Sequence, residues 1–248
     1  MNITQPNKNS AAYQDFLQQV NNKVTAAMGW LAIRKIEYVW NHWVGEHLYR
    51  LYIPDKDLLL DFEWYPVSNF NYNYIRVNYD TDIVRLLERI FPETVFDTRD
   101  LDIIALKQRA ANAFFKENGV SPLYGDNILR LAWCKDGIPY QCIAIQKNEI
   151  IANTTKRNCA VGHGTFMMLR YLNEAWGWDE IYVKECLDNS YSNLVYQLRG
   201  TLIKKTPKRR VWWNKDGAKW HIKKEQTDQF IPFYLCESVL YRYPGNIL

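Results

Sequence analysis

The sequence lacks an apolar run long enough to cross a bilayer. A membrane-spanning helix needs about 20 consecutive apolar residues, and no stretch of the 248 residues approaches that length. The first ten residues, MNITQPNKNS, are polar and contain one lysine, so they do not resemble a secretory signal. We therefore expect no membrane partner and a cytoplasmic location.

The chain is also poor in groups that bind metals or form disulfides. Its five cysteines are odd in number and include no C-x-x-C pair, which indicates neither a zinc ribbon nor a disulfide framework. Of the four histidines, His42 and His47 are one residue too far apart for the H-x-x-E-H metal motif. We expect a reduced protein with no metal ion. The cysteines are Cys134, Cys142, Cys159, Cys186 and Cys236.

Aromatic residues are abundant, at 15% of the chain, with 17 Tyr and 10 Trp. Such an excess fits either a rigid core or a surface that stacks on flat ligands such as nucleobases. The apolar fraction of 48% and the charged fraction of 23% are those of an ordinary globular protein, so we favour the core. A chain of this length can bury that core as one large domain or two small ones.

Residues 1–98 are predicted to form an α/β region whose role the sequence does not reveal. Residues 1–12 resemble a flexible tail, and apolar residues at helical spacing predict a short helix over Tyr13–Val24. A Pro-Asp-Lys-Asp turn lies between two stretches with the residue alternation typical of strands, which predicts a hairpin over Leu48–Trp64. The last two predicted elements of this region are a strand and a helix, at Tyr74–Tyr79 and Ile83–Ile90.

A polar, acid-rich connection at residues 97–100 places a domain boundary between residues 98 and 99. A helix over Leu101–Asn118 is predicted next, with Gly119 placed to end it. Antiparallel strands and then alternating strands and helices follow. For residues 99–248 this order predicts an α/β (α+β) fold, with a mixed, mostly antiparallel sheet flanked by helices. The elements are expected at Asn127–Trp133, Tyr140–Ile145, Glu149–Cys159, Thr165–Trp176, Glu180–Cys186, Ser190–Leu198, Thr201–Lys205 and 210–223.

The segment Cys159–Thr165 joins a predicted strand to a predicted helix. Its two glycines would let the backbone approach a ligand closely. The free amides would point outward at the positive end of the helix, an arrangement that suits a pyrophosphate. A tight strand-to-helix turn also uses glycine for steric reasons alone, so both interpretations stay open. The amides concerned are those of Gly162, His163, Gly164 and Thr165.

A second segment, NSYSNLVYQLRG from Asn189, carries a family resemblance. It resembles the pattern N-x-x-A-x-x-x-Y-x-x-x-G of GNAT-type N-acyltransferases, with Ser192 at the small-residue position. Gly162 and Gly164 match the small positions of that superfamily's turn, (Q/R)-x-x-G-x-(G/A), while Cys159 stands at its Gln/Arg position. The two patterns also follow one another in the order and spacing of the family.

The resemblance implies an acyl-CoA-dependent N-acyltransferase. Residues 162–165 and Asn189 would bind acetyl-CoA or another acyl-CoA, and Lys156 or Arg157 would add charge at its pyrophosphate. A backbone amide of the preceding strand would polarise the thioester carbonyl. Tyr196 matches the family tyrosine that protonates the departing thiolate; an aromatic residue packing one face of a short helix is the alternative. Neither the acyl acceptor nor the general base is identified.

Lys208, Arg209 and Arg210 lie beside Trp212 and Trp213. Cations that bind phosphates and indole rings that stack on bases together suit a nucleic-acid surface. The same interleaving fits a twisted hairpin with an apolar face and a solvated face, and we favour the hairpin.

Asp61 and Glu63 are two residues apart on a predicted strand and so share one face. A metal-dependent nuclease needs such carboxylates, but Tyr65 stands where the D-x(n)-(D/E)-x-K motif has its lysine. The whole chain also resembles phage-encoded nucleases that join a Vsr-like region to a GNAT-like C-terminal domain. Three hypotheses result. The first is an acyl-CoA-dependent N-acyltransferase-like protein of phage origin acting on or near nucleic acid; the others are a non-catalytic nucleic-acid- or partner-binding protein with a GNAT-like fold, and a nuclease.

Overall fold

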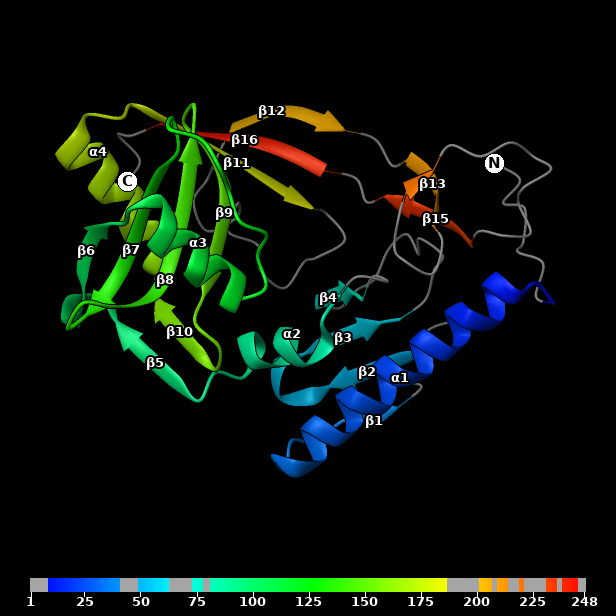
Figure 1. Ribbon diagram of the computed structural model, residues 1–248. Helices are drawn as coiled ribbons and strands as arrows, with labels where there is room; N and C mark the ends of the chain where they lie inside the picture. Colours follow the sequence, from blue (N-terminus) through cyan, green and yellow to red (C-terminus); the bar gives the residue numbers. More distant parts are fainter. Residues whose placement is uncertain are drawn as a thin grey trace. The chain divides into compact units, whose positions relative to one another are not determined.

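The computed structural model describes residues 9–40, 49–62, 73–77, 81–186, 201–206, 209–213, 219–220, 231–235 and 238–244 (Figure 1). The chain forms two compact units, each described here by itself. The first comprises Met1–Val84, Cys186–Asn193 and Thr206–Ser238, and the second Arg85–Glu185, Leu194–Lys205 and Val239–Leu248. No helix in these described ranges is both long and apolar enough to cross a membrane.

The first unit begins with the helix α1, Ala11–Ile33. Its N-cap is Ser10, whose hydroxyl oxygen accepts a hydrogen bond from an N–H of the first turn at 3.2 Å. The helix therefore starts inside the predicted tail of residues 1–12. It also continues beyond the predicted end at Val24, because buried residues keep their helical spacing as far as Leu31.

A four-stranded sheet in the order β1-β2-β3-β4 follows α1. The predicted hairpin is formed by the antiparallel strands β2 and β3, joined by a 3-10 turn at Pro54–Lys56. β3 and β4 are parallel. The leucines of β3 are fully buried, as is typical of a strand covered on both faces. The strands are β1 Val39–Trp40, β2 Arg50–Ile53, β3 Leu58–Asp61 and β4 Asn73–Arg76.

The first unit also contains an antiparallel sheet in the order β14-β13-β15. The predicted last hairpin corresponds to the pairing of β13 with β14, in which Trp212 lies opposite Trp220. The strands are β13 Arg209–Trp213, β14 Lys219–Trp220 and β15 Ile231–Leu235.

The second unit is built on a seven-stranded sheet in the order β12-β16-β11-β9-β8-β7-β6. The pairs from β6 to β9 are antiparallel, whereas β9 and β11 are parallel. The predicted α/β class, with a mixed, mostly antiparallel sheet flanked by helices, is confirmed. The strands are β6 Asp102–Ala105, β7 Leu129–Lys135, β8 Ile138–Gln146, β9 Glu149–Thr155, β11 Glu180–Cys186, β12 Thr201–Thr206 and β16 Ser238–Pro244.

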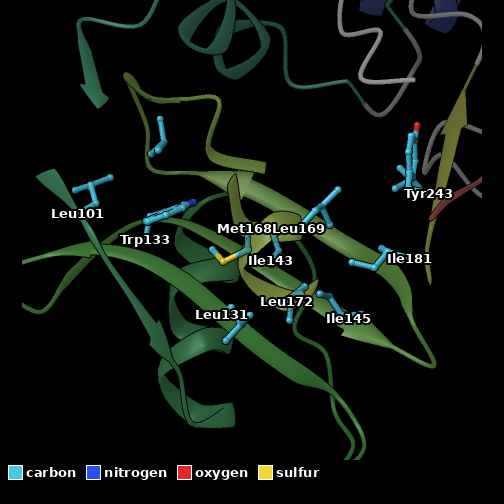
Figure 2. Packing of buried hydrophobic residues seen from close by; sticks show 12 residues of the cluster. Leu101, Leu131, Trp133, Ile143, Ile145, Met168, Leu169, Leu172, Ile181 and Tyr243 are labelled. Carbon is cyan, nitrogen blue, oxygen red and sulfur yellow. The ribbon is translucent and has the colours of Figure 1, made fainter. Parts of the chain in front are cut away.

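Side chains alternate along β7 and β8, and this alternation separates the cores on the two faces of the sheet. One core joins odd-numbered residues to the helix α4, Gly164–Trp176 (Figure 2), and the other joins even-numbered residues to α3, Gln108–Glu117. The two helices therefore cover opposite faces. The first core includes Leu131, Trp133, Ile143, Ile145, Met168, Leu169 and Leu172; the second includes Ala111, Phe114, Phe115, Ala132, Cys134, Cys142 and Ala144.

The predicted helix over Leu101–Asn118 is wrong in its first part. Residues Asp102–Ala105 form β6, which pairs with β7, and the helix α3 begins only at Gln108. Two adjacent isoleucines favour a strand, and the open edge of β7 supplies their hydrogen-bonding partner. The pairing is a long-range contact that overrides the helical periodicity of the segment.

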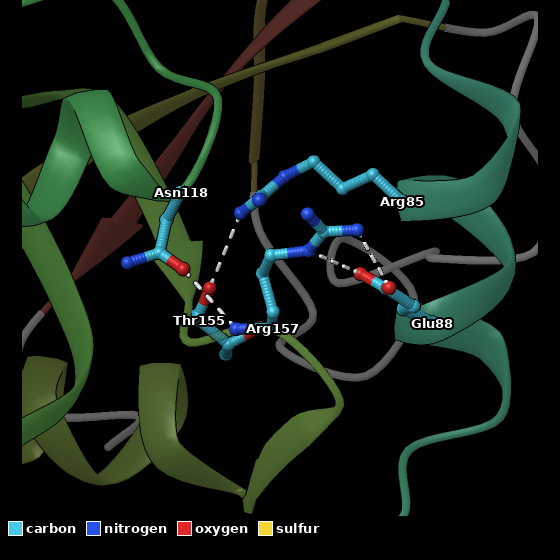
Figure 3. A network of polar contacts seen from close by, with 5 residues as sticks. All are labelled: Arg85, Glu88, Asn118, Thr155 and Arg157. Carbon is cyan, nitrogen blue, oxygen red and sulfur yellow. Dashed lines mark hydrogen bonds and ion pairs between the residues drawn. The ribbon is translucent and has the colours of Figure 1, made fainter.

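Residues 85–98 belong to the second unit, and both ends of this stretch contact other parts of it. β5, Thr94–Asp97, pairs in parallel with β10, Cys159–Gly162. From α2, Ile83–Ile90, the buried Glu88 accepts two hydrogen bonds from Arg157, at 2.7 and 2.8 Å (Figure 3). The compact units divide the chain near residue 84, and the predicted domains, residues 1–98 and 99–248, stay a prediction.

Cys142 is expected to be inert to alkylation in the folded protein. Its side chain is fully buried between β8 and α3, and this burial raises the pKa of the thiol to about 12. The thiolate is the reactive form, so it is scarce at pH 8. Mass spectrometry after iodoacetamide treatment should find Cys142 unmodified in buffer and modified in urea. Labelling of Cys142 in buffer at the rate seen in urea would contradict this assignment.

Candidate functional site

The strand β9 carries a bulge at the point where it leaves its parallel neighbour. Its pairing with β11 covers only Glu149 and Ile150. On its other side the register with β8 shifts between Ala144 and Ile145, so that Ile151 is an extra residue. A bulge adds local twist and bends its strand. β9 therefore parts from β11 as it runs toward residue 155, and its backbone on that side lacks a β11 partner.

The chain then passes through β10 into a tight turn that opens α4. His163 adopts the left-handed conformation, with φ 54° and ψ 16°, and its side chain is exposed. The first helical backbone bond runs from the Met167 N–H to the His163 carbonyl, at 2.9 Å. The N–H groups of residues 164–166 precede this bond and so have no acceptor within the helix. The first turn contains no acidic residue, and His163 makes no side-chain cap.

These features make the start of α4 suited to an anion. Unsatisfied N–H groups and the helix dipole together favour negative charge at a helix N-terminus. A Cβ added to Gly162 would meet only the Phe96 carbonyl oxygen, at 3.5 Å, an ordinary contact distance. The predicted strand-to-helix turn is present, with β10 ending at Gly162 and α4 beginning at Gly164, while the binding role of Gly162, His163, Gly164 and Thr165 stays a prediction.

Gly164 is packed more tightly than its neighbours. A Cβ there would lie 2.0 Å from Oε1 of Gln141 and 2.8 Å from Cγ1 of Val161. The Gly164 carbonyl accepts a hydrogen bond from the Trp133 indole N–H at 2.8 Å. Glycine at this position is therefore needed for close packing of helix on sheet, which supports the steric interpretation of the turn; the pyrophosphate interpretation stays a prediction.

The charges nearest the turn are already paired. Hydrogen bonds from the side chain and backbone of Arg99, with the charges of Arg99 and His163, lower the pKa of Asp97 to about 2. Asp97 lies beside Gly162 in the β5–β10 register, and its carboxylate is 2.6 Å from the Arg99 guanidinium. Its negative charge is thus offset where it stands.

The two cations predicted to add charge at a pyrophosphate make other contacts. Arg157 forms a bidentate pair with Glu88, and the Lys156 ammonium lies 5.1 Å from the centre of the Tyr140 ring. The sequence could not show this, because Glu88 is 69 residues from Arg157. In the described structure these two cations are therefore engaged elsewhere, and pyrophosphate binding at the turn stays a prediction.

Gln141 and Asn153 are site residues that the sequence analysis missed. Both contact the hydroxyl of Thr165, from β8 and β9 respectively. One signal was present: Gln141 occupies a core-facing position on β8, two residues before Ile143, where the alternation calls for an apolar side chain. A polar residue on a core face indicates a specific hydrogen-bonding task.

Several predicted residues lie outside the described part of the chain. These are Asn189, Tyr196, Lys208 and Glu63. Arg209 and Arg210 belong to β13, opposite Leu235 and Tyr234, and only their backbone is described. The roles assigned to all six from the sequence stay predictions.

Asp61 is placed unfavourably for a metal-dependent nuclease. It is fully buried, and its carboxylate lies 3.9 Å from Nε of the equally buried Arg50. Arg76 stands opposite it on β4. A carboxylate beside a guanidinium group already has a counter-charge, so a divalent cation would have to compete with it. Within the described ranges no cluster of three or more His, Cys, Asp or Glu side chains could hold a metal ion.

No protein-family model and no curated protein sequence matches the chain. The solved structures that are similar to it include three with a TM-score of 0.37 each. They are the ribosomal-protein-S18-alanine N-acetyltransferase of Escherichia coli (12% identity, 58% of this chain and 93% of that chain), the IAA acetyltransferase of Bacillus cereus ATCC 14579 (9%, 58% and 99%) and an N-acetyltransferase of Staphylococcus aureus Mu50 (9%, 59% and 98%). All three are N-acetyltransferases, the kind of protein that the sequence pattern predicted.

Proposed function

We propose that this protein binds acyl-CoA and acts as an N-acyltransferase. The observation that carries the proposal is the open N-terminus of α4, which follows a strand that bulges at Ile151 and parts from β11. Within the described part of the chain, the N–H groups of residues 164–166 have no acceptor inside α4, and β9 has no β11 partner beyond Ile150; both elements belong to the same unit, with β10 between them. An extended ligand with an anionic end would suit this arrangement: its anionic end would lie at the N–H groups that begin α4, and the rest would lie along the β9 backbone beyond the bulge.

The roles of the residues follow from where their polar groups stand. The N–H groups at residues 164–166 would bind the diphosphate, aided by the helix dipole. A backbone N–H of β9 beyond the bulge would donate to the thioester carbonyl oxygen and stabilise the negative charge that develops there. Tyr196 would return a proton to the departing thiolate, as the sequence resemblance implies, and the acceptor amine would lose its proton to a base through water.

A charge reversal at the turn tests the proposal. Acetyl-CoA should raise the melting temperature of the wild-type protein, because a ligand that binds only the native state stabilises it. His163→Asp should weaken acetyl-CoA binding by about tenfold, since it puts a negative charge at the helix terminus that must receive the diphosphate. Both binding constants can be measured by calorimetry.

The matched control is His163→Asn, which has the same size as the aspartate variant and no charge. Asn and Asp both tolerate the left-handed backbone that His163 adopts, so the two variants should be equally stable. His163→Asn should keep wild-type affinity. A wild-type protein whose melting temperature is unchanged by acetyl-CoA would overturn the proposal, and so would equal affinities of the two variants.

A further inference from the structure

Arg89, in the last turn of α2, carries a positive charge that no carboxylate balances in the described part of the chain. Its Nη2 donates a hydrogen bond to the hydroxyl oxygen of the buried Thr154, at 2.8 Å, and this acceptor is neutral. The residue as a whole is exposed, but desolvation of its guanidinium lowers the pKa of Arg89. The adjacent carboxylate, Glu88, is already paired, because both of its oxygens accept hydrogen bonds from Arg157 (Figure 3).

A second guanidinium reaches the same hydroxyl oxygen. Arg85, one turn earlier on α2, donates to the Thr154 hydroxyl at 3.3 Å and to the Thr155 carbonyl oxygen at 3.4 Å. Two cations of one helix are therefore held close to a single neutral group, although like charges repel each other. Such an arrangement is unfavourable until an anion joins it.

The helix dipole accounts for only part of this arrangement. A cation in the last turn of a helix is favourable, and α2 ends at Ile90, directly after Arg89. That interaction is equally available to a side chain that extends into water, so it gives no reason for a guanidinium held against Thr154 beside another one. Two neighbouring guanidiniums do suit a phosphate or a carboxylate, because their forked N–H groups match the oxygens of these anions.

The two arginines lie at the part of β9 that has left its parallel neighbour. The pairing of β9 with β11 ends at Ile150, and Thr154 follows on the same strand. Successive side chains of a strand project to opposite faces of the sheet. Asn153 contacts Thr165 at the start of α4, whereas the Thr154 hydroxyl lies 3.4 Å from the carbonyl oxygen of Asn118, which ends α3. A molecule bound by the arginines would thus reach this part of β9 from the face opposite α4.

We infer that Arg89 and Arg85 bind an oxyanion, a phosphate or a carboxylate group, on the molecule that accepts the acyl group. The acceptor is then an acidic amine, with its anionic group at the arginines and its amine at the edge of β9. The inference rests on the proposed function, because it names the class of the second substrate of that site. The acyl donor and the acceptor would approach β9 from opposite faces, so neither would block the other.

The test uses two probes, inorganic phosphate and acetate, and measures their dissociation constants by calorimetry. Saturating coenzyme A is present throughout, so that neither probe is bound at the start of α4. Wild-type protein should bind at least one probe, and the tighter one identifies the oxyanion. Arg89→Gln should weaken that probe by about tenfold, because a charge-assisted hydrogen bond is lost.

The matched control is Arg170→Gln, which removes the same charge from an exposed side chain of α4. It should leave the affinity within about twofold of wild type, because salt screens exposed charges. Three results would overturn the inference: wild-type protein that binds neither probe, equal affinities of wild type and Arg89→Gln, or equal losses in Arg89→Gln and Arg170→Gln. In each case the proposed function stands, since coenzyme A still binds. Wild-type protein that does not bind coenzyme A would overturn the proposed function and, with it, the assignment of the anion to an acceptor.

Arg89→Lys separates anion binding from a structural role, and it also answers the question if Arg89→Gln does not fold. Lysine keeps the charge but lacks the fork, so the affinity for the tighter probe should fall about threefold to tenfold. The free energy of unfolding, measured without either probe, should stay near the wild-type value, because no ion pair is lost. A loss of stability with unchanged affinity for the probe would make the contact with Thr154 structural and overturn the inference.

Discussion

Gly164→Ala is expected to lower the free energy of unfolding of the second unit by about 3 kcal/mol, an overpacking penalty at the upper end of the usual range. The new Cβ would lie 2.8 Å from Cγ1 and 2.9 Å from Cβ of Val161, both shorter than carbon atoms tolerate. Gln141 can turn its Oε1 away, but Val161 is a β-branched core residue and cannot. Urea unfolding followed by fluorescence measures the loss.

Gly162→Ala is the matched control, two residues earlier in the same turn. Its Cβ would meet the Phe96 carbonyl oxygen at 3.5 Å, an ordinary contact. The change should therefore alter the free energy of unfolding by less than about 1 kcal/mol. Equal stability of the two variants would show that the close approach of α4 to the sheet at Gly164 is not a feature of the folded protein.

Arg157→Met is expected to lower the free energy of unfolding by about 2 kcal/mol, the order measured when one partner of a partly buried ion pair is removed. The Glu88 side chain is only 7% exposed, so its carboxylate would lose its guanidinium without regaining water. Glu88→Met should lower the free energy of unfolding by less, because the Arg157 side chain is 52% exposed and returns to solvent. Urea unfolding of both variants measures which of them loses more stability.

A surface pair of the same chemistry serves as the control for this prediction. Arg170 and Glu174 form an i, i+4 pair on α4 with side chains 48% and 59% exposed. Exposed pairs contribute little, so Arg170→Met should change the stability by less than about 0.5 kcal/mol. If Arg157→Met lowers the free energy of unfolding no more than Arg170→Met does, the ion pair between Glu88 and Arg157 does not stabilise the fold.

The elements that were predicted correctly are those whose sequence signals all lie within one short stretch of the chain. The hairpin of β2 and β3 was marked by alternation around a Pro-Asp turn, and α4 by an apolar face that follows a Gly-x-Gly turn. The segment at residues 101–107 was misassigned. There the local periodicity is helical, and the strand forms because the edge of β7, some thirty residues later, is available for pairing.

In the candidate site, the sequence predicted the residues of the turn but not the side chains that contact them. The sequence placed Gly162, His163, Gly164 and Thr165 in the turn. It could not place Gln141 and Asn153 against Thr165, because the three come from β8, β9 and α4 and meet only through strand register. The family resemblance likewise offered Lys156 or Arg157 as charge for a pyrophosphate, and the fold pairs Arg157 with Glu88.

By itself, the sequence determined the α/β class, the order of antiparallel strands and helices, and the glycine turn at the start of α4. Each of these depends on hydrophobic period and turn chemistry within a few residues. Only the tertiary structure decided where β9 parts from β11, which side chains support Thr165 and which charges are already paired. These depend on register and on contacts between distant segments, because a one-residue shift in a strand would turn every side chain to the other face.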